Sequence, residues 1–272
     1  MTPSGTPRAP LTLLTFAPMI DSELSRLVLT HYGLPYREAW HIFGWASVLT
    51  FLHGGYGRIP VLYGDGVRLS GPRAIVDRFD ALQPGERRLL PAGQPLRTQV
   101  EADWARYHGD LGTHTAVLAY FHLLPHREIM IEPFSRGIPR YEAALVRPCY
   151  PLLHRLFYLL LHLGPEKVAD ALTRVRMAFD RTDARVSDGR PYLAGDTLTL
   201  GDFALASATA PLLLPDGYRA PIPPLETMPP ELKAIVTEMR QHETARFVQR
   251  IYAAHPPLPP ALARSSAMGA GG

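Results

Sequence analysis

The residues best suited to chemistry gather in 98–124, an apolar stretch that ionisable side chains interrupt. If this stretch is a helix, Trp104, Tyr107, Leu111 and His114 share one face, because residues seven apart stack on the same side. His108 lies beside them, and imidazole exchanges protons near neutral pH, so this face suits acid–base work on a small molecule. Packing against another helix explains Trp104 and Leu111 at least as well. For Tyr107 and His114 both interpretations stay open.

Metal, disulfide and phosphate-loop chemistry find little support elsewhere in the chain. His122 and His126 are four residues apart, but Pro125 lies between them and would disturb a helix, and no carboxylate cluster lies nearby. Cys149 is the one cysteine, which excludes an internal disulfide and a cysteine-based zinc site. We interpret it as a buried structural thiol. The glycine-rich 54–57 precedes a predicted strand rather than a helix, so it is not a phosphate loop.

Charge and hydropathy argue against two classes of partner. Lysine and arginine number 28 against 25 acidic residues, and no basic run exceeds two residues, so nothing predicts a nucleic-acid surface. The most apolar stretch, 149–164, is interrupted by His154, Arg155 and His162 before it reaches the ~18 residues of a membrane span. No targeting segment is visible, and a single cysteine fits a reducing compartment. We therefore expect a cytoplasmic protein with neither nucleic acid nor membrane as partner.

The elements that position these groups fall into two halves. The first half alternates strands and helices, with strands predicted at 11–16, 37–43, 59–63 and 67–69. Its helices are predicted from Asp21 or Ser22 to Gly33 and over 73–82, with a short helix or loop at 46–57. Residues 83–96 read as a linker, everything beyond them is predicted to be helical, and 256–272 to be a disordered Pro/Gly/Ala tail.

Four motifs in this order resemble the cytosolic glutathione S-transferase superfamily. GLPY at 33–36 is similar to its first helix-to-strand turn, and GRIPVL at 57–62 to its strand with a cis-proline, which would be Pro60. DGVRLSGPRAIVDRF at 65–79 resembles the next hairpin and helix, and YLAGDTLTLGDFALA at 192–206 the start of the central helix. In that last motif Thr199 and Asp202 form a capping box, with Leu198 packing on Phe203.

The resemblance, which covers about residues 11–253, implies an α/β plus all-α fold. It has a thioredoxin-like N-terminal domain (βαβ–ββα, with the cis-proline) at 10–82, a linker at 83–96 and an all-helical C-terminal domain at 97–255. It also implies a homodimer that uses glutathione as co-substrate on a small hydrophobic electrophile, by conjugation, isomerisation or elimination. Detoxification or secondary metabolism is the setting such chemistry suggests.

The implied glutathione site follows the third and fourth predicted strands, and one part of it departs from the family pattern. Val61, after the cis-proline, would pair its main chain with the cysteinyl part, and Arg58 would meet the glycyl carboxylate. An acidic or amide residue and then Ser or Thr usually hold the γ-glutamyl end, but Gly71 and Pro72 stand there. Proline has no N–H and no hydroxyl. Ser70, Arg73 or the amide of Gly71 would substitute, so the predicted glutathione contacts are Arg58, Ile59, Pro60, Val61, Ser70, Gly71 and Arg73.

The tyrosine, serine or cysteine that normally activates the thiol is also missing. Thr15 and Met19 stand at the two corresponding positions, so Thr15 and Ser22 are the hydroxyls that we assign to catalysis. The resemblance places the electrophile against the first long helix of the second half, where Tyr107, His108, Leu111 and His114 are the predicted pocket residues.

Three functions stay open on these grounds. The first is a transferase with a modified glutathione site. The second is a non-catalytic protein that holds an apolar ligand or a partner protein. The third is a glutathione-independent enzyme in which Tyr107, His108 or His114 does the acid–base work.

Overall fold

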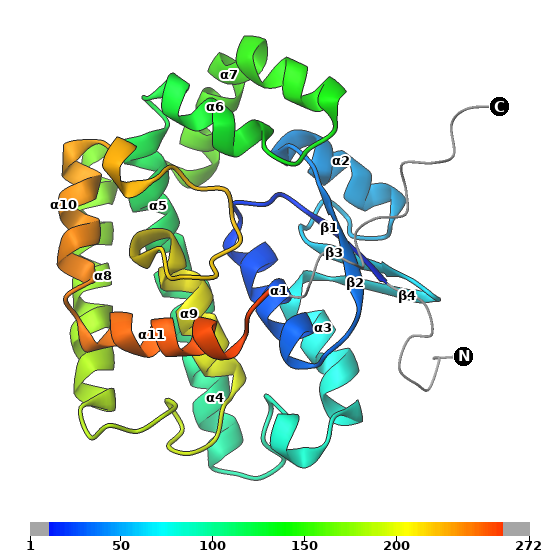
Figure 1. The fold of residues 1–272 in the computed structure, drawn as a ribbon, viewed down its shortest axis with the longest axis vertical. Helices are drawn as coiled ribbons and strands as arrows, with labels where there is room; N and C mark the ends of the chain where they lie inside the picture. The colour runs from blue at the N-terminus through cyan, green and yellow to red at the C-terminus, as the bar shows by residue number, and fades with distance from the viewer. Residues whose placement is uncertain (1–10, 258–272) are drawn as a thin grey trace.

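The computed structural model describes residues 11–257 and begins with a four-stranded sheet that carries helices on both sides (Figure 1). The strands β1 (Leu11–Thr15), β2 (Tyr36–Trp40), β3 (Val61–Gly64) and β4 (Val67–Ser70) run in the order β2-β1-β3-β4. β1 and β2 are parallel, joined by α1 (Ile20–His31), and the other two pairings are antiparallel. α2 (Phe43–Leu52) and α3 (Gly71–Phe79) complete the unit. The predicted βαβ–ββα order is confirmed.

Two local features of this unit follow directly from the sequence. Asp65 and Gly66 both have positive φ, 47° and 75°, as a tight hairpin turn between β3 and β4 requires. The Ile59–Pro60 peptide bond is cis, as the resemblance implies. The N–H of Gly71 donates to the carbonyl of Pro60 over 2.8 Å. This bond holds the start of α3 beside residues 58–60.

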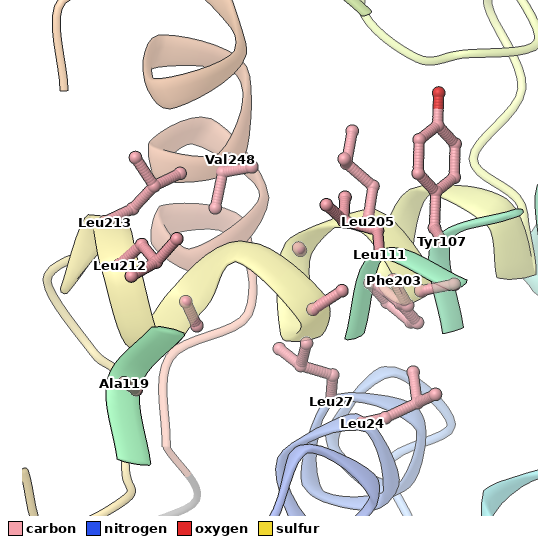
Figure 2. Packing of buried hydrophobic residues seen from close by; sticks show 14 of the residues in the cluster. Leu24, Leu27, Tyr107, Leu111, Ala119, Phe203, Leu205, Leu212, Leu213 and Val248 are labelled. Carbon is pink, nitrogen blue, oxygen red and sulfur yellow. The ribbon is translucent and has the colours of Figure 1, made fainter. Parts of the chain in front are cut away.

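The second half is helical and is built around α9 (Leu200–Leu213), all of whose residues are buried. The predicted capping box is present: the main-chain N–H and the hydroxyl of Thr199 both donate to the Asp202 carboxylate, over 2.7 and 2.8 Å. Figure 2 shows Leu24 and Leu27 of α1 packed toward Phe203 of α9, so one apolar core joins the two halves. The remaining helices are α4 (Leu96–Trp104), α5 (Gly112–Leu123), α6 (Arg127–Ser135), α7 (Arg140–Leu161), α8 (Pro165–Val186), α10 (Pro230–Met239) and α11 (Glu243–Ala254).

The first long helix of this half differs from the prediction in its middle. Between α4 and α5, residues Ala105–Leu111 form a π-helix, labelled η3. A π-helix bonds each residue to the fifth rather than the fourth along, so every turn takes an extra residue. Tyr107, Leu111 and His114 are nevertheless all buried.

Three short 3-10 turns lie between these elements: η1 (Asp80–Leu82), η2 (Gly85–Arg87) and η4 (Leu225–Thr227).

Cys149 is exposed on α7, so its prediction as a buried thiol was wrong: its neighbours Val146 and Tyr150 occupy the inward face of the helix instead. Within residues 11–257, no helix is long and apolar enough to cross a membrane. The predicted tail at 256–272 lies almost wholly outside the described residues.

Candidate functional site

Two cavities meet where the N-terminal end of α1 faces α4, η3 and α5. The apolar cavity, of about 410 Å³, runs from Phe16 and Ile20 toward Tyr120 and Phe157. The polar-edged cavity, of about 330 Å³, follows the cis-proline loop and the start of α3. Four residues line both of them and so form their shared wall: Met19, Asp21, Phe43 and His108. A molecule in one cavity would therefore touch the same side chains as a molecule in the other.

Most of the predicted glutathione contacts line the polar-edged cavity, namely Arg58, Ile59, Ser70, Gly71 and Arg73. Val61 and Pro60 do not line it. Val61 pairs with Leu14 on one side and Ser70 on the other, so its main chain lies within the sheet. Ile59 comes before β3 begins and faces the cavity. Of the residues next to the cis-proline, Ile59 lines the cavity and Val61 does not.

The start of α3 offers few donors to an anion. Gly71 has a left-handed φ of 81°, its N–H is used by the carbonyl of Pro60, and Pro72 has no N–H. The hydroxyl of Ser70 lies 3.4 Å from the carbonyl of Gly55, a long hydrogen bond. The first two residues of α3 thus leave no main-chain N–H for a carboxylate at this helix N-terminus.

The two arginines at this cavity differ in their freedom. Arg73 is held by Glu101 and Asp77, with nitrogen–oxygen distances of 2.6 and 2.8 Å. Those bonds, with Glu101 first among them, raise its pKa above the ordinary value even though partial burial opposes this. Arg58 is exposed and makes no ion pair with any of residues 11–257. Arg58 is therefore the cation that remains available to a ligand.

Aromatic rings dominate the apolar cavity. The ring centroids of Phe16 and Phe43 lie 5.2–5.9 Å from that of Phe157, and Tyr120 stacks on Phe157 at 4.7 Å. Burial raises the pKa of Tyr120, so its phenol stays protonated, and its oxygen has no hydrogen-bond partner among the described residues. The segment between α9 and α10 crosses the helical half in Figure 1 and closes one side with Pro221, Ile222 and Pro223.

A histidine–aspartate pair spans the shared wall. Nε2 of His108 lies 2.9 Å from Oδ1 of Asp21, so η3 meets the first turn of α1. The Trp104 ring stacks on the imidazole with centroids 4.1 Å apart, which fixes the ring plane. His108 is about a quarter exposed, and its Nδ1 has no hydrogen-bond partner within residues 11–257. The pair combines a positioned imidazole, a carboxylate and an open edge in contact with both cavities.

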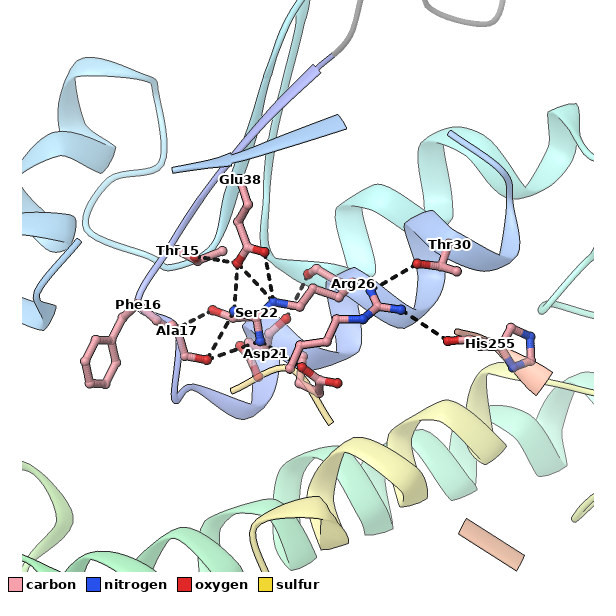
Figure 3. Close-up of polar contacts among 12 residues, drawn as sticks. Thr15, Phe16, Ala17, Asp21, Ser22, Arg26, Thr30, Glu38 and His255 are labelled. Atoms are coloured by element: carbon pink, nitrogen blue, oxygen red, sulfur yellow. Dashed lines mark hydrogen bonds and ion pairs between the residues drawn. The ribbon is translucent and has the colours of Figure 1, made fainter. Parts of the chain in front are cut away.

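The two hydroxyls assigned to catalysis line neither cavity. Thr15 is fully buried, and its hydroxyl donates to Glu38 over 2.8 Å, in a network that also holds Arg26 (Figure 3). Ser22 is likewise buried and donates to the carbonyl of Phe16 over 3.0 Å. α1 begins at Ile20, one or two residues earlier than predicted, which turns Ser22 into the interior instead of leaving it as a cap. We correct both assignments on this basis.

Three of the four predicted pocket residues also lie elsewhere. Tyr107 is buried, with its hydroxyl 3.2 Å from that of Thr182, and Leu111 is buried in the core. His114 is nearly buried, with Nε2 3.1 Å from Asp110. Of the four predicted residues, only His108 lines the cavities. Core packing was the correct alternative for Leu111 and also describes Tyr107.

Several lining residues escaped the sequence analysis. Phe43, Tyr120, Phe157 and Ile222 come from four separate segments, each of which reads locally as ordinary core sequence, whereas Met19 was noted only as the residue at a catalytic position. Asp21 was considered only as a helix cap. Its position in the first turn of a helix that directly follows a strand was the one local signal that marked it.

Comparisons with known proteins agree with this fold. The family model "Glutathione S-transferase, C-terminal domain" matches residues 139–243. No curated protein matches the sequence. Among solved structures, a glutathione S-transferase from Rhodospirillum rubrum superposes with a TM-score of 0.55 at 18% identity, covering 88% of this chain and 91% of that one.

Two further structures have the same fold at similarly low sequence identity. The beta-etherase LigF from Sphingobium gives a TM-score of 0.56 at 16% identity, covering 89% of this chain and 99% of its own. A glutathione S-transferase from Methylobacillus flagellatus, solved with glutathione bound, gives 0.52 at 19% identity, covering 90% and 93%. At these identities the likeness establishes the fold.

Proposed function

We propose that this chain, which has the glutathione S-transferase fold and matches the C-terminal domain model of that family over residues 139–243, joins glutathione to a small hydrophobic electrophile. Glutathione would occupy the polar-edged cavity and the electrophile the apolar one. The observation that carries this proposal is the wall shared by the two cavities, because it lets a thiol in one approach a carbon atom in the other.

The polar-edged cavity supports the peptide part of glutathione. Ile59 lines the cavity just before β3 begins, and in this proposal its main chain pairs with the extended peptide part of glutathione. Arg58, exposed and without an ion-pair partner among the described residues, suits the glycyl carboxylate. The γ-glutamyl carboxylate is left with Ser70 and Arg73, because Pro72 donates nothing.

This missing anchor predicts weak binding. Two hydrogen bonds to a charged carboxylate are worth roughly 1.5–3 kcal/mol each. Their loss corresponds to an affinity lower by on the order of a hundredfold or more. We therefore expect a dissociation constant for glutathione in the millimolar range, and partial recovery in a variant that restores one donor.

The apolar cavity favours a compact aromatic or similarly flat electrophile. Its volume of about 410 Å³ falls within the roughly 300–1,000 Å³ of small-molecule sites. Phe16, Phe43 and Phe157 provide ring faces and edges, and offset or edge-on contacts with a ligand ring are favourable. The unpaired hydroxyl of Tyr120 would donate a hydrogen bond to an oxygen on the ligand.

Calorimetric titration with glutathione tests the proposal. We expect the wild type to bind weakly and Pro72→Ser to bind about tenfold more tightly, which is the effect of one recovered charge-assisted bond. Ala116→Trp, which fills the apolar cavity, serves as the matched variant: it should bind glutathione like the wild type and lose turnover of a chloronitrobenzene electrophile. Absence of glutathione binding in both the wild type and Pro72→Ser would refute the transferase function.

A second candidate, binding of an apolar ligand without glutathione, is favoured by the same Gly71–Pro72 start of α3. In that case the apolar cavity would act alone. An apolar fluorescent probe would then bind the wild type but not Ala116→Trp, in which the cavity is filled. Glutathione would neither bind nor change the affinity of the probe for the wild type. A glutathione-independent enzyme would share this outcome but depend on His108.

The family resemblance also leads us to propose a homodimer in the cytoplasm. Sedimentation at several protein concentrations would test the first part. A single species of 30.1 kDa at all concentrations would contradict it.

A further inference from the structure

We infer that His108, held by Asp21, takes the proton from the glutathione thiol and so replaces the missing tyrosine, serine or cysteine. The inference rests on the proposed function, because it needs glutathione in the polar-edged cavity. His108 would be the catalytic residue and Asp21 the residue that positions it, and the two come from different halves of the chain.

The available groups lead to this pair. Among the described residues that line either cavity, the ionisable side chains are Asp21, Arg58, Arg73, Tyr120 and His108. The arginines hold their protons, and burial keeps Tyr120 protonated. Thr15 and Ser22 are buried and engaged elsewhere. Of this set, imidazole is the group that accepts a proton readily near neutral pH.

The position of His108 suits the task. It lines both cavities, so its ring lies where a sulfur atom must pass between them. Nε2 donates its hydrogen to Asp21, which leaves the lone pair of Nδ1 as the base. Trp104 stacks on one face of the ring, with centroids 4.1 Å apart, and so holds the imidazole in its orientation.

The charges around the thiol make the two residues interdependent. The N-terminal end of α1 favours an anion, but the carboxylate of Asp21 lies in its first turn and would repel a thiolate. When His108 accepts the proton it becomes an imidazolium between the carboxylate and the sulfur. The Asp21 charge then stabilises the imidazolium instead of opposing the thiolate.

In the proton transfer, the S–H bond of glutathione breaks, its proton forms an N–H bond at Nδ1 of His108, and both electrons stay on sulfur. The thiolate then attacks the electrophile in the apolar cavity. In a substitution the leaving group departs with the bonding pair, and the imidazolium returns its proton to that group or to water.

The test is the pH titration of the thiolate absorbance of bound glutathione. Each protein is saturated with glutathione, and calorimetry confirms saturation. In the wild type we expect the bound thiol to ionise well below the ~8.5 of an ordinary thiol. His108→Gln should raise that midpoint by about 1–2 units, since it leaves a bare carboxylate beside the sulfur. Asp21→Asn should raise it less.

The double variant separates this role from a structural one. If Asp21 repels the thiolate once the imidazole is gone, His108→Gln combined with Asp21→Asn should ionise more readily than His108→Gln alone. His242→Gln is the matched control, because that histidine also pairs with an aspartate, over 2.7 Å, but lines neither cavity. It should titrate like the wild type.

The outcomes distinguish the two proposals. If the wild type binds no glutathione, the proposed function fails and this inference falls with it. If glutathione binds but its thiol ionises as it does in free solution, or equally in the wild type and His108→Gln, the transferase site stands and the role of His108 is refuted.

Discussion

Two histidine–aspartate pairs of nearly the same length join helices in this protein, yet their surroundings differ. His108 and Asp21 lie 2.9 Å apart and connect η3 to α1. His242 and Asp183 lie 2.7 Å apart and connect the start of α11 to α8. Both imidazoles are about one fifth exposed. Distance and exposure alone would not tell the two pairs apart.

The difference lies in what remains unbonded. Asp183 also accepts hydrogen bonds from the main-chain N–H and the hydroxyl of Thr244, over 2.7 and 2.6 Å, so it anchors the first turn of α11. Asp21 has His108 as its side-chain partner, and the pair faces two cavities. A pair whose hydrogen-bonding atoms all have partners contributes to stability. A pair that keeps a hydrogen-bonding atom without a partner beside a cavity is available for chemistry.

The largest expected difference between the pairs is in turnover. With glutathione and a chloronitrobenzene electrophile, His108→Gln should lower kcat about a hundredfold, the lower end of general-base effects, with little change in KM for glutathione. His242→Gln should keep the wild-type kcat per folded molecule. Equal losses in both variants would mean that the His108 pair is also structural.

Stability should show the opposite order. Asp183→Ala removes the bonds that anchor α11 and should lower the free energy of unfolding by ~2 kcal/mol. Asp21→Ala breaks a part-exposed pair and should cost under ~1 kcal/mol. Urea unfolding of both variants measures the difference. A larger loss in Asp21→Ala would contradict the assignment of the two roles.

Acid should remove the stabilisation that the Asp183 carboxylate provides. Burial raises the pKa of Asp183, but the hydrogen bonds from Thr244 and His242 outweigh it and hold the pKa below the ordinary 3.8. A depressed carboxylate stabilises the fold fully above its unfolded pKa and loses that contribution as pH falls through the folded value. The stability gap between wild type and Asp183→Ala should therefore be constant near neutral pH and shrink below about pH 4. A gap that widens on acidification would contradict this.

The smallest effect concerns the two arginines at the polar-edged cavity, which repeat the same contrast between free and saturated groups. Arg58→Ala should weaken glutathione binding by ~0.5–1 kcal/mol, roughly threefold, and the loss should diminish in high salt. Arg73→Ala should change the affinity less, because Glu101 and Asp77 already hold that guanidinium. Calorimetry at two salt concentrations measures both. A larger effect for Arg73 would identify it as the carboxylate anchor.

Prediction from sequence succeeded where neighbours along the chain decide the structure. The strands, the Asp65–Gly66 turn and the Thr199–Asp202 capping box were read correctly because each depends on residues within a few positions of one another. It failed at Cys149, whose predicted burial depended on which face of α7 turns inward. It also failed at Thr15 and Ser22, because their assignment relied on the exact residue at which α1 begins.

By itself the sequence determined the two-part architecture and the missing N–H at Pro72, while its family resemblance indicated the cis-proline. These are local properties of backbone and hydrogen-bonding capacity. Only the tertiary structure decided which ionisable groups meet. Asp21 and His108 are 87 residues apart, and their contact depends on how α1 packs on the helical half. Tyr107 and His108 are neighbours on the π-helix Ala105–Leu111, yet Tyr107 is buried and His108 lines the cavities, and packing against the other helices decides which of the two faces the site.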